Sequence, residues 1–275
     1  MPELPETETI ARDLDALIKG ARIEGVQVHR RDVLRGPSAA TLRRRVAGTT
    51  ITGCWRRAKL VVIDLDSGDR LVVQPRFTGA LLVDDGRLDD ESRDYVTVTF
   101  HLADGRSLLY RDVRRLGTVT LMDPSRFARY SDALGPEPLD SSFTVDHLSA
   151  RIRGSRQAIK KVLMDQRALA GVGNIYATEA LWRAAIDPSR AAAALTAAET
   201  ATLYRELQSV LRQSIDARGT SFRDYRDARG RRGGFVEKLQ AYGRAGLPCL
   251  RCGHRLVGTA AIDGRMTVLC AHCQR

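Results

Sequence analysis

The sequence CLRCGHRLVGTAAIDGRMTVLCAHC, residues 249–273, contains two Cys-x2-Cys pairs with residues 253–269 between them. Four thiolates at this spacing are typical of a closed, tetrahedral, structural Zn²⁺ site. The segment between the pairs predicts a β-hairpin, with Asp263-Gly264 as a two-residue turn. We therefore expect one structural zinc ion in a C-terminal zinc-finger hairpin, held by Cys249, Cys252, Cys270 and Cys273, with His254 and His272 as alternative ligands.

The composition indicates a folded, basic chain. Hydrophobic residues make up 43% of 275 residues, and Lys plus Arg total 44 against 33 acidic residues, for a net charge of +11. The first figure argues against global disorder, and the second favours a polyanionic partner, nucleic acid before an anionic membrane. No stretch reaches the roughly 18 apolar residues of a membrane span, and no signal peptide is recognisable. We expect a monomer without membrane association, in a bacterial cytosol or nucleoid.

The first half of the chain predicts one helix followed by many strands. Residues 5–20 predict the helix, because Pro5 suits a first turn, acidic residues follow it, and Gly20 can end it. Residues 21–122 indicate an antiparallel sandwich or barrel, because they contain short Val- and Leu-rich segments bounded by turn residues, at 60–65, 70–74, 95–100 and 117–122.

The second half predicts a linker, several helices and one long loop. Residues 133–142, ALGPEPLDSS, are typical of a linker. Thr196 and Glu199 form a capping-box pattern at the start of a long helix with an apolar face of Leu203, Leu207, Val210 and Leu211. Residues 218–235, RGTSFRDYRDARGRRGGF, are basic and Gly-rich and too long for an ordinary connection.

A glycine turn between two helical segments is a candidate anion site. RALAGVGNIYATEAL, residues 167–181, contains Gly171 and Gly173, and Asn174 can cap the second segment. Backbone N–H groups at such a turn and at a helix N-terminus bind anions, and Lys160 and Lys161 add positive charge nearby. A phosphate group is the expected ligand, although an ordinary turn would explain the pattern without the basic context.

The first six residues, MPELPE, allow covalent chemistry. Methionine before proline is normally removed, which would leave Pro2 with a free secondary amine. An α-amino group has a pKa near 7.7–8, against about 10.4 for lysine, so roughly a tenth of it is unprotonated at neutral pH. Such an amine attacks a carbonyl-like carbon and gives an iminium, while Glu3 could shuttle protons to the ring oxygen or leaving group. Taken alone, MPELPE is better explained as an ordinary helix start.

Together, however, the motifs closely resemble the formamidopyrimidine-DNA glycosylase and endonuclease VIII family over nearly the whole chain. The resemblance is carried by MPELPETET (1–9), GVGNIYATEAL (171–181), YGRAGLPCLRCG (242–253) and GRMTVLCAHCQR (264–275). It implies an α+β multidomain fold: an N-terminal β-sandwich with flanking helices over residues 1–132, a helix-two-turn-helix DNA-binding domain over 133–235, and the zinc finger over 236–275. The implied activity is that of a bifunctional glycosylase and AP lyase that excises oxidised bases from damaged double-stranded DNA.

The resemblance also implies roles for individual residues. Pro2 matches the nucleophile that attacks C1′ of the damaged nucleoside, Glu3 matches the proton donor and acceptor, and Glu6 belongs to the same motif. Matches to residues that contact DNA phosphate or handle the oxidised purine are Lys59, Lys160, Asn174 and Arg265. The 218–235 loop aligns with the one that closes over the extruded base. For Lys59, a solvated lysine at a strand edge is the alternative.

Base flipping leaves a hole in the duplex that side chains must fill. In the family a methionine, an arginine and a phenylalanine do so, and the matching residues here are Phe77, Arg114 and Leu116. The usual His-Leu-Gly before the first of them is replaced by Gln74, Pro75 and Arg76, and Val113 replaces a proline. These departures put the lesion range and the opposite-base preference in doubt. Core packing of Phe77 and Leu116 is the competing interpretation.

Three functions follow in order. The first is excision of oxidised purines, such as 8-oxoguanine and formamidopyrimidines, with strand cleavage. The second keeps the family and shifts the preference to oxidised pyrimidines or abasic sites, because the wedge is altered. The third is a non-catalytic protein that recognises distorted duplex DNA, which the charge and the zinc finger alone would fit.

Overall fold

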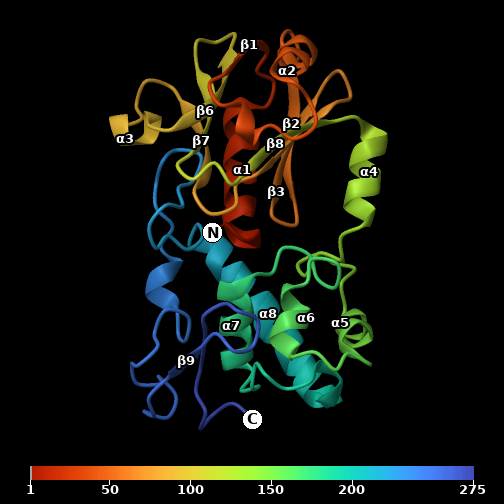
Figure 1. Ribbon diagram of the computed structural model, residues 1–275, viewed down its shortest axis with the longest axis vertical. Coiled ribbons are helices and arrows are strands. Elements are labelled where there is room, and N and C mark those ends of the chain that lie inside the picture. Colours follow the sequence, from red (N-terminus) through yellow and green to blue (C-terminus); the bar gives the residue numbers. More distant parts are fainter. Residues whose placement is uncertain (1) are drawn as a thin grey trace. The chain divides into compact units, whose positions relative to one another are not determined.

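The computed structural model describes residues 2–275, which form two compact units (Figure 1). The first contains the described residues up to Asp132 together with Ala217–Val236, and the second contains Ala133–Asp216 together with Glu237–Arg275. Residues 217–236 thus belong to the first unit, whereas the resemblance assigns 218–235 to the helical domain. Within residues 2–275, no helix is both long and apolar enough to cross a membrane. The expected removal of Met1 lies outside the described residues.

Two four-stranded antiparallel sheets build the first unit (Figure 1). The strand order is β1-β6-β7-β5 in one sheet and β2-β3-β4-β8 in the other. The strands are β1 (Ile23–Val28), β2 (Ile51–Arg57), β3 (Leu60–Leu65), β4 (Arg70–Gln74), β5 (Gly79–Asp84), β6 (Val96–Leu102), β7 (Ser107–Asp112) and β8 (Thr118–Met122). The helical segments are α1 (Leu4–Ile18), η1 (Arg31–Val33), α2 (Ala39–Val46), α3 (Asp90–Arg93) and α4 (Pro124–Asp132).

One hydrophobic core joins both sheets and α1, which confirms the predicted β-sandwich. Ile10, Leu14 and Ile18 of the helix are fully buried, in the same cluster as Phe100 of one sheet and Ile63 of the other. The three helix positions recur at the spacing of one helical face, so α1 must bury that face. This packing fixes the helix that follows Pro2 and Glu3 in the chain.

The second unit is mainly helical. Its elements are α5 (Val145–Ile152), α6 (Ile159–Met164), α7 (Asn174–Arg183), η2 (Ala192–Ala194) and α8 (Ala197–Asp216), with η3 (Phe235–Lys238) at its border with the first unit. The predicted capping box of α8 is present, since the Thr196 N–H donates to Glu199 Oε2 at 2.7 Å and the Glu199 N–H to Thr196 Oγ1 at 3.2 Å. The predicted apolar face of α8 is fully buried.

The zinc-finger hairpin pairs β9 (Val257–Thr259) with β10 (Thr267–Leu269), and its connection is longer than the sequence predicts. Thr259 pairs with Thr267, so residues 260–266 form the loop and the two-residue turn at Asp263-Gly264 was wrong. The Asp263 carboxylate is not available to close a tight turn, because it accepts the Arg265 N–H at 3.0 Å and pairs with Lys160 at 3.4 Å.

Candidate active site and DNA-binding surface

The candidate catalytic motif lies at the N-terminal end of α1. Pro2 is buried, and Glu3 is the N-cap residue with 1% of its surface exposed. The Glu3 N–H donates to Glu6 Oε2 at 2.8 Å, which completes a capping box, and Pro5 needs no hydrogen-bond acceptor in this first turn. The sequence therefore holds residue 2 directly next to a buried carboxylate at a rigid helix start.

Lys59 lies in a two-residue turn packed against the same helix end. The turn joins β2 to β3, where Arg57 pairs with Leu60, and Ala58 adopts a φ of 53°. The Thr7 hydroxyl of α1 reaches the Ala58 carbonyl at 3.4 Å. The first unit thus brings Lys59 close to the motif of Pro2 and Glu3, in a turn and not at the edge of a strand.

The 217–236 loop meets the motif through Glu6. The Thr220 N–H donates to Glu6 Oε1 at 2.8 Å, so the two oxygens of this carboxylate serve two distant segments. Gly219 has a φ of +84°, and a Cβ at this position would lie 3.0 Å from Glu6 Cγ. Both facts require glycine here, because a side chain would push the loop off the helix.

The three wedge residues are on the surface of the first unit. Phe77 is 44% exposed and Leu116 is 41% exposed, which excludes core packing for both. The Arg114 guanidinium lies 5.1 Å from the centre of the Phe77 ring, within reach of a cation–π interaction. Large apolar side chains in solvent are costly unless another molecule covers them, so this group is a candidate binding surface.

A buried carboxylate that the sequence analysis missed holds the wedge loops. Asp112 accepts hydrogen bonds from the Thr78 hydroxyl and, at 2.7 Å, from the Gly117 N–H, and Thr78 Oγ1 accepts the Arg114 N–H at 2.9 Å. A Cβ on Gly117 would lie 2.0 Å from the hydroxyl oxygen of Tyr110, so the backbone must approach closely. The available signal was positional: Thr78 directly follows the first wedge residue, and Asp112 precedes the second by two.

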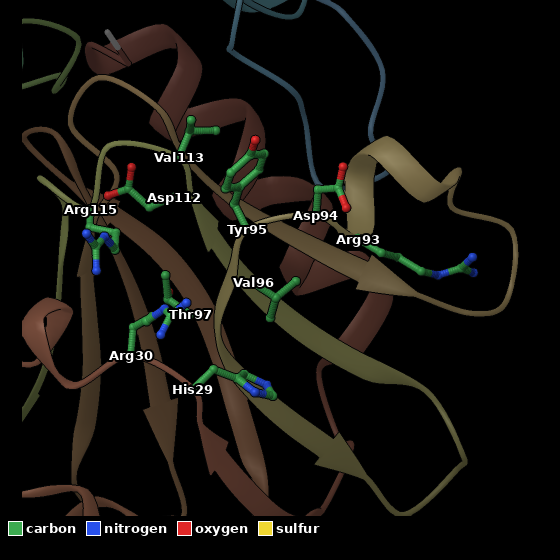
Figure 2. A pocket seen from close by; sticks show the side chains of 10 residues that line it. All are labelled: His29, Arg30, Arg93, Asp94, Tyr95, Val96, Thr97, Asp112, Val113 and Arg115. Atoms are coloured by element: carbon green, nitrogen blue, oxygen red, sulfur yellow. The ribbon is translucent and has the colours of Figure 1, made fainter.

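A hollow of about 820 Å³ adjoins the second wedge loop (Figure 2). Its lining includes Thr97, Tyr95, Arg30 and Arg115, and Figure 2 shows Arg93 pointing away from them. Tyr95 is 61% exposed and holds a φ of 58°, which costs energy in a non-glycine residue. Guanidinium groups beside an exposed aromatic ring match the chemistry of a nucleic-acid backbone and bases.

In the second unit, Asn174 and Arg265 belong to neighbouring segments. Asn174 is the first residue of α7, and its Nδ2 donates to the Met266 carbonyl at 3.0 Å. Its Oδ1 is buried without a hydrogen-bond partner. Arg265 precedes Met266 in the hairpin loop and is exposed. The structure therefore brings together the two residues that the resemblance pairs as phosphate ligands.

Lys160 is placed differently from its neighbour Lys161. Its side chain is fully buried, and Nζ lies 2.6 Å from Thr267 Oγ1 and 3.4 Å from an Asp263 oxygen. Lys161, by contrast, is exposed. Within its unit, Lys160 supports the loop that carries Arg265.

The four predicted cysteines form a metal site. Their Sγ atoms all lie within 4.8 Å of one another, and Zn–S bonds of about 2.3 Å in a tetrahedron require separations near 3.8 Å. The rings of His254 and His272 stack on each other at 4.1 Å. The site fits one structural zinc ion with the cysteines as its ligands.

Family models match nearly the whole chain. The "Formamidopyrimidine-DNA glycosylase N-terminal domain" matches residues 1–119, the "Formamidopyrimidine-DNA glycosylase H2TH domain" matches 134–226, and the "Zinc finger found in FPG and IleRS" matches 246–275. The chain belongs to the formamidopyrimidine-DNA glycosylase family. Relatives of that name include those of Moorella thermoacetica, 45% identical over 93% of both chains, and of Roseiflexus sp., 40% identical over the full length of both.

Solved glycosylase structures share the fold. A point mutant of Lactococcus lactis FPG in complex with DNA containing Fapy-dG has a TM-score of 0.91 and 30% identity, with both chains fully covered. A complex of Lactococcus lactis Fpg with DNA containing an abasic site also has a TM-score of 0.91, over 99% of both chains. The α+β architecture, the helix-two-turn-helix domain and the zinc finger are thereby confirmed.

Proposed function

We propose that this glycosylase excises oxidised purines from duplex DNA and then cleaves the strand, with Pro2 as nucleophile. The observation that carries the proposal is the position of Pro2, which directly precedes a buried carboxylate at the rigid N-terminus of α1. An unprotonated amine and a proton-transferring acid are the two groups that covalent base removal requires.

The reaction follows from these groups. The lone pair of the Pro2 nitrogen attacks C1′ as the bond from C1′ to the base breaks, and the base leaves with the bonding electrons and a proton. Glu3 passes a proton to the ring oxygen as the sugar opens, and the nitrogen then forms an iminium with C1′. The iminium acidifies the C2′ proton, so successive eliminations break the two C–O bonds to the flanking phosphates. Hydrolysis of the iminium frees Pro2.

DNA binding is assigned to surfaces in both units. Arg114, Phe77 and Leu116 fill the duplex where the nucleotide has left, and Asn174 with Arg265 binds its phosphates. Zinc, when bound, fixes the hairpin that carries Arg265. The net charge of +11 supports a DNA partner, and the relative from Lactococcus lactis was crystallised with DNA containing Fapy-dG. A monomer acting in a bacterial cytosol or nucleoid is the simplest setting.

A lesion panel tests the substrate. Single-turnover excision should be fastest on 8-oxoguanine or formamidopyrimidine duplexes, and undamaged duplex should not be cut. A second candidate, preference for oxidised pyrimidines or abasic sites, is favoured by the exposed Phe77 and Leu116, which differ from the family's usual wedge. Faster cleavage of those substrates would replace the first proposal. Absence of cutting on every lesion would reduce the chain to a DNA-binding protein.

A further inference from the structure

Arg218 joins the 217–236 loop to α1. Its Nη2 pairs with an oxygen of Asp13 on the helix, and its Nε and Nη2 lie 2.9 and 2.5 Å from Asp227 Oδ2 in the loop. One guanidinium therefore connects two carboxylates, and the helix partner lies 205 residues from Arg218 in the chain. Arg218 also holds a φ of 63°, where glycine would be less strained. A strained arginine with two acidic partners indicates that its side chain is needed.

The loop carboxylate in this network is buried and organises a turn. Asp227 is fully buried, and its Oδ1 accepts the N–H groups of Arg229 and Arg231, both at 2.9 Å. Burial alone would raise the pKa of Asp227, but these N–H groups and the Arg218 guanidinium lower it overall. A buried anion needs such partners, so the turn and Arg218 stabilise each other.

Further hydrogen bonds hold the loop in one position on the first unit. The Val83 N–H of β5 donates to the Ala228 carbonyl at 2.9 Å. Inside the loop, the Ser221 hydroxyl donates to the Tyr225 carbonyl at 2.8 Å and accepts the Gly233 N–H at 2.9 Å. With the bond from Thr220 to Glu6, the loop is ordered against α1.

We propose that Arg218 is a positioning residue whose link to Asp13 pre-orders the 217–236 loop for the damaged base. This inference rests on the proposed function, in which the loop closes over an extruded base. Ordering the loop before DNA arrives raises the fraction of binding-competent protein and lowers the entropy cost of closure. Base excision should depend on the link, whereas cleavage at an abasic site, which offers no base to hold, should not.

An ordinary surface ion pair is the competing interpretation, since such pairs contribute little. Arg218 is 37% exposed and Asp13 is 13% exposed at the side chain. The pair of Arg45 with Asp69 matches these values, at 39% and 11%, and has comparable geometry in the same unit without touching the loop. Arg45→Gln is therefore a matched control for Arg218→Gln.

The experiment compares Arg218→Gln, Asp13→Ala and Arg45→Gln in the full-length, zinc-loaded protein. Asp13→Ala is included because it removes the link without changing the loop sequence. Single-turnover excision of 8-oxoguanine should fall on the order of tenfold in the first two variants, while cleavage of an abasic duplex stays within about twofold. Hydrogen exchange of the free protein should speed up at residues 219–235 in both. The control should match the wild type in all three measurements.

Each alternative outcome is decisive. Unchanged excision in both link variants, or equal losses on the damaged base and the abasic site, would overturn the proposal. If the wild-type protein cut neither substrate, the proposed function would fail, and hydrogen exchange would still test the link. Unchanged exchange in the loop of both variants would show that Arg218 does not order it.

Discussion

The carboxylate of Glu6 accepts the backbone N–H of Thr220 at 2.8 Å, although 214 residues separate the two positions. Its other oxygen accepts the Glu3 N–H. Glutamine at this position presents one oxygen and one NH2 group, so one of the two backbone donors must face another donor. An unsatisfied buried donor costs about 1–3 kcal/mol. We expect Glu6→Gln to lower the free energy of unfolding by this amount and to slow base excision.

Exposed Glu24 supplies the control for this change, because Glu24→Gln removes the same charge from β1. Thermal unfolding and single-turnover excision of both variants are the measurements. Equal behaviour of the two variants would mean that the shared carboxylate has no special role.

The exposure of Phe77 predicts a loss of function without a loss of stability. Removing a buried phenylalanine costs about 3–5 kcal/mol, but a side chain that is 44% exposed contributes much less. Phe77→Ala should therefore unfold within a few degrees of the wild type and excise a base at least about tenfold more slowly, because the flipped state loses its wedge. Tyr130→Ala, at 40% exposure on α4, is the matched control. A large drop in the melting temperature of Phe77→Ala would point back to core packing.

Two adjacent lysines separate a buried structural role from surface charge. Lys160→Met leaves Asp263, with 8% of its side chain exposed, without its partner. Breaking one side of a buried ion pair typically costs about 3–5 kcal/mol, so we expect a clear fall in melting temperature and weaker DNA binding through the displaced Arg265 loop. Lys161→Met removes an exposed charge and should change stability by less than about 0.5 kcal/mol. Similar melting temperatures for both variants would contradict the buried role.

Removal of zinc should be visible at one tryptophan. Trp182 packs against Cys249, Cys270 and Leu256 in the core of the finger, whereas Trp55, the other tryptophan, is in β2. In a Trp55→Phe variant, chelation should shift the Trp182 emission to longer wavelength and abolish DNA binding, and added zinc should restore both. Metal analysis should give one zinc per chain. Emission that ignores the chelator would show that the finger core does not depend on the metal.

Local patterns in the sequence were sufficient for most elements. The strands at 60–65 and 70–74 were predicted with the observed bounds, because short apolar runs end at turn residues there. The zinc site was predicted from spacing alone. The hairpin turn was wrong because the partner of Asp263 is Lys160, 103 residues earlier, and no local pattern reveals that contact.

The candidate site divides in the same way. Motif residues such as Glu3 and Asn174 could be named from resemblance, since their neighbours in the chain identify them. The supports of the wedge and of the loop could not, because Thr78 meets Asp112 and Arg218 meets Asp13 only through the tertiary fold. Exposure of Phe77 was likewise undecided, as an aromatic residue between strands fits a core or a surface equally well.

The nucleophile is tested most directly by borohydride reduction during turnover on an 8-oxoguanine duplex, followed by mass spectrometry of the adduct. The account predicts one covalent complex, with the deoxyribose carbon attached to the nitrogen of Pro2 at a chain start lacking Met1, and none with Pro2→Gly in comparable yield. Attachment to a lysine such as Lys59, or equal trapping by the Pro2 variant, would contradict it.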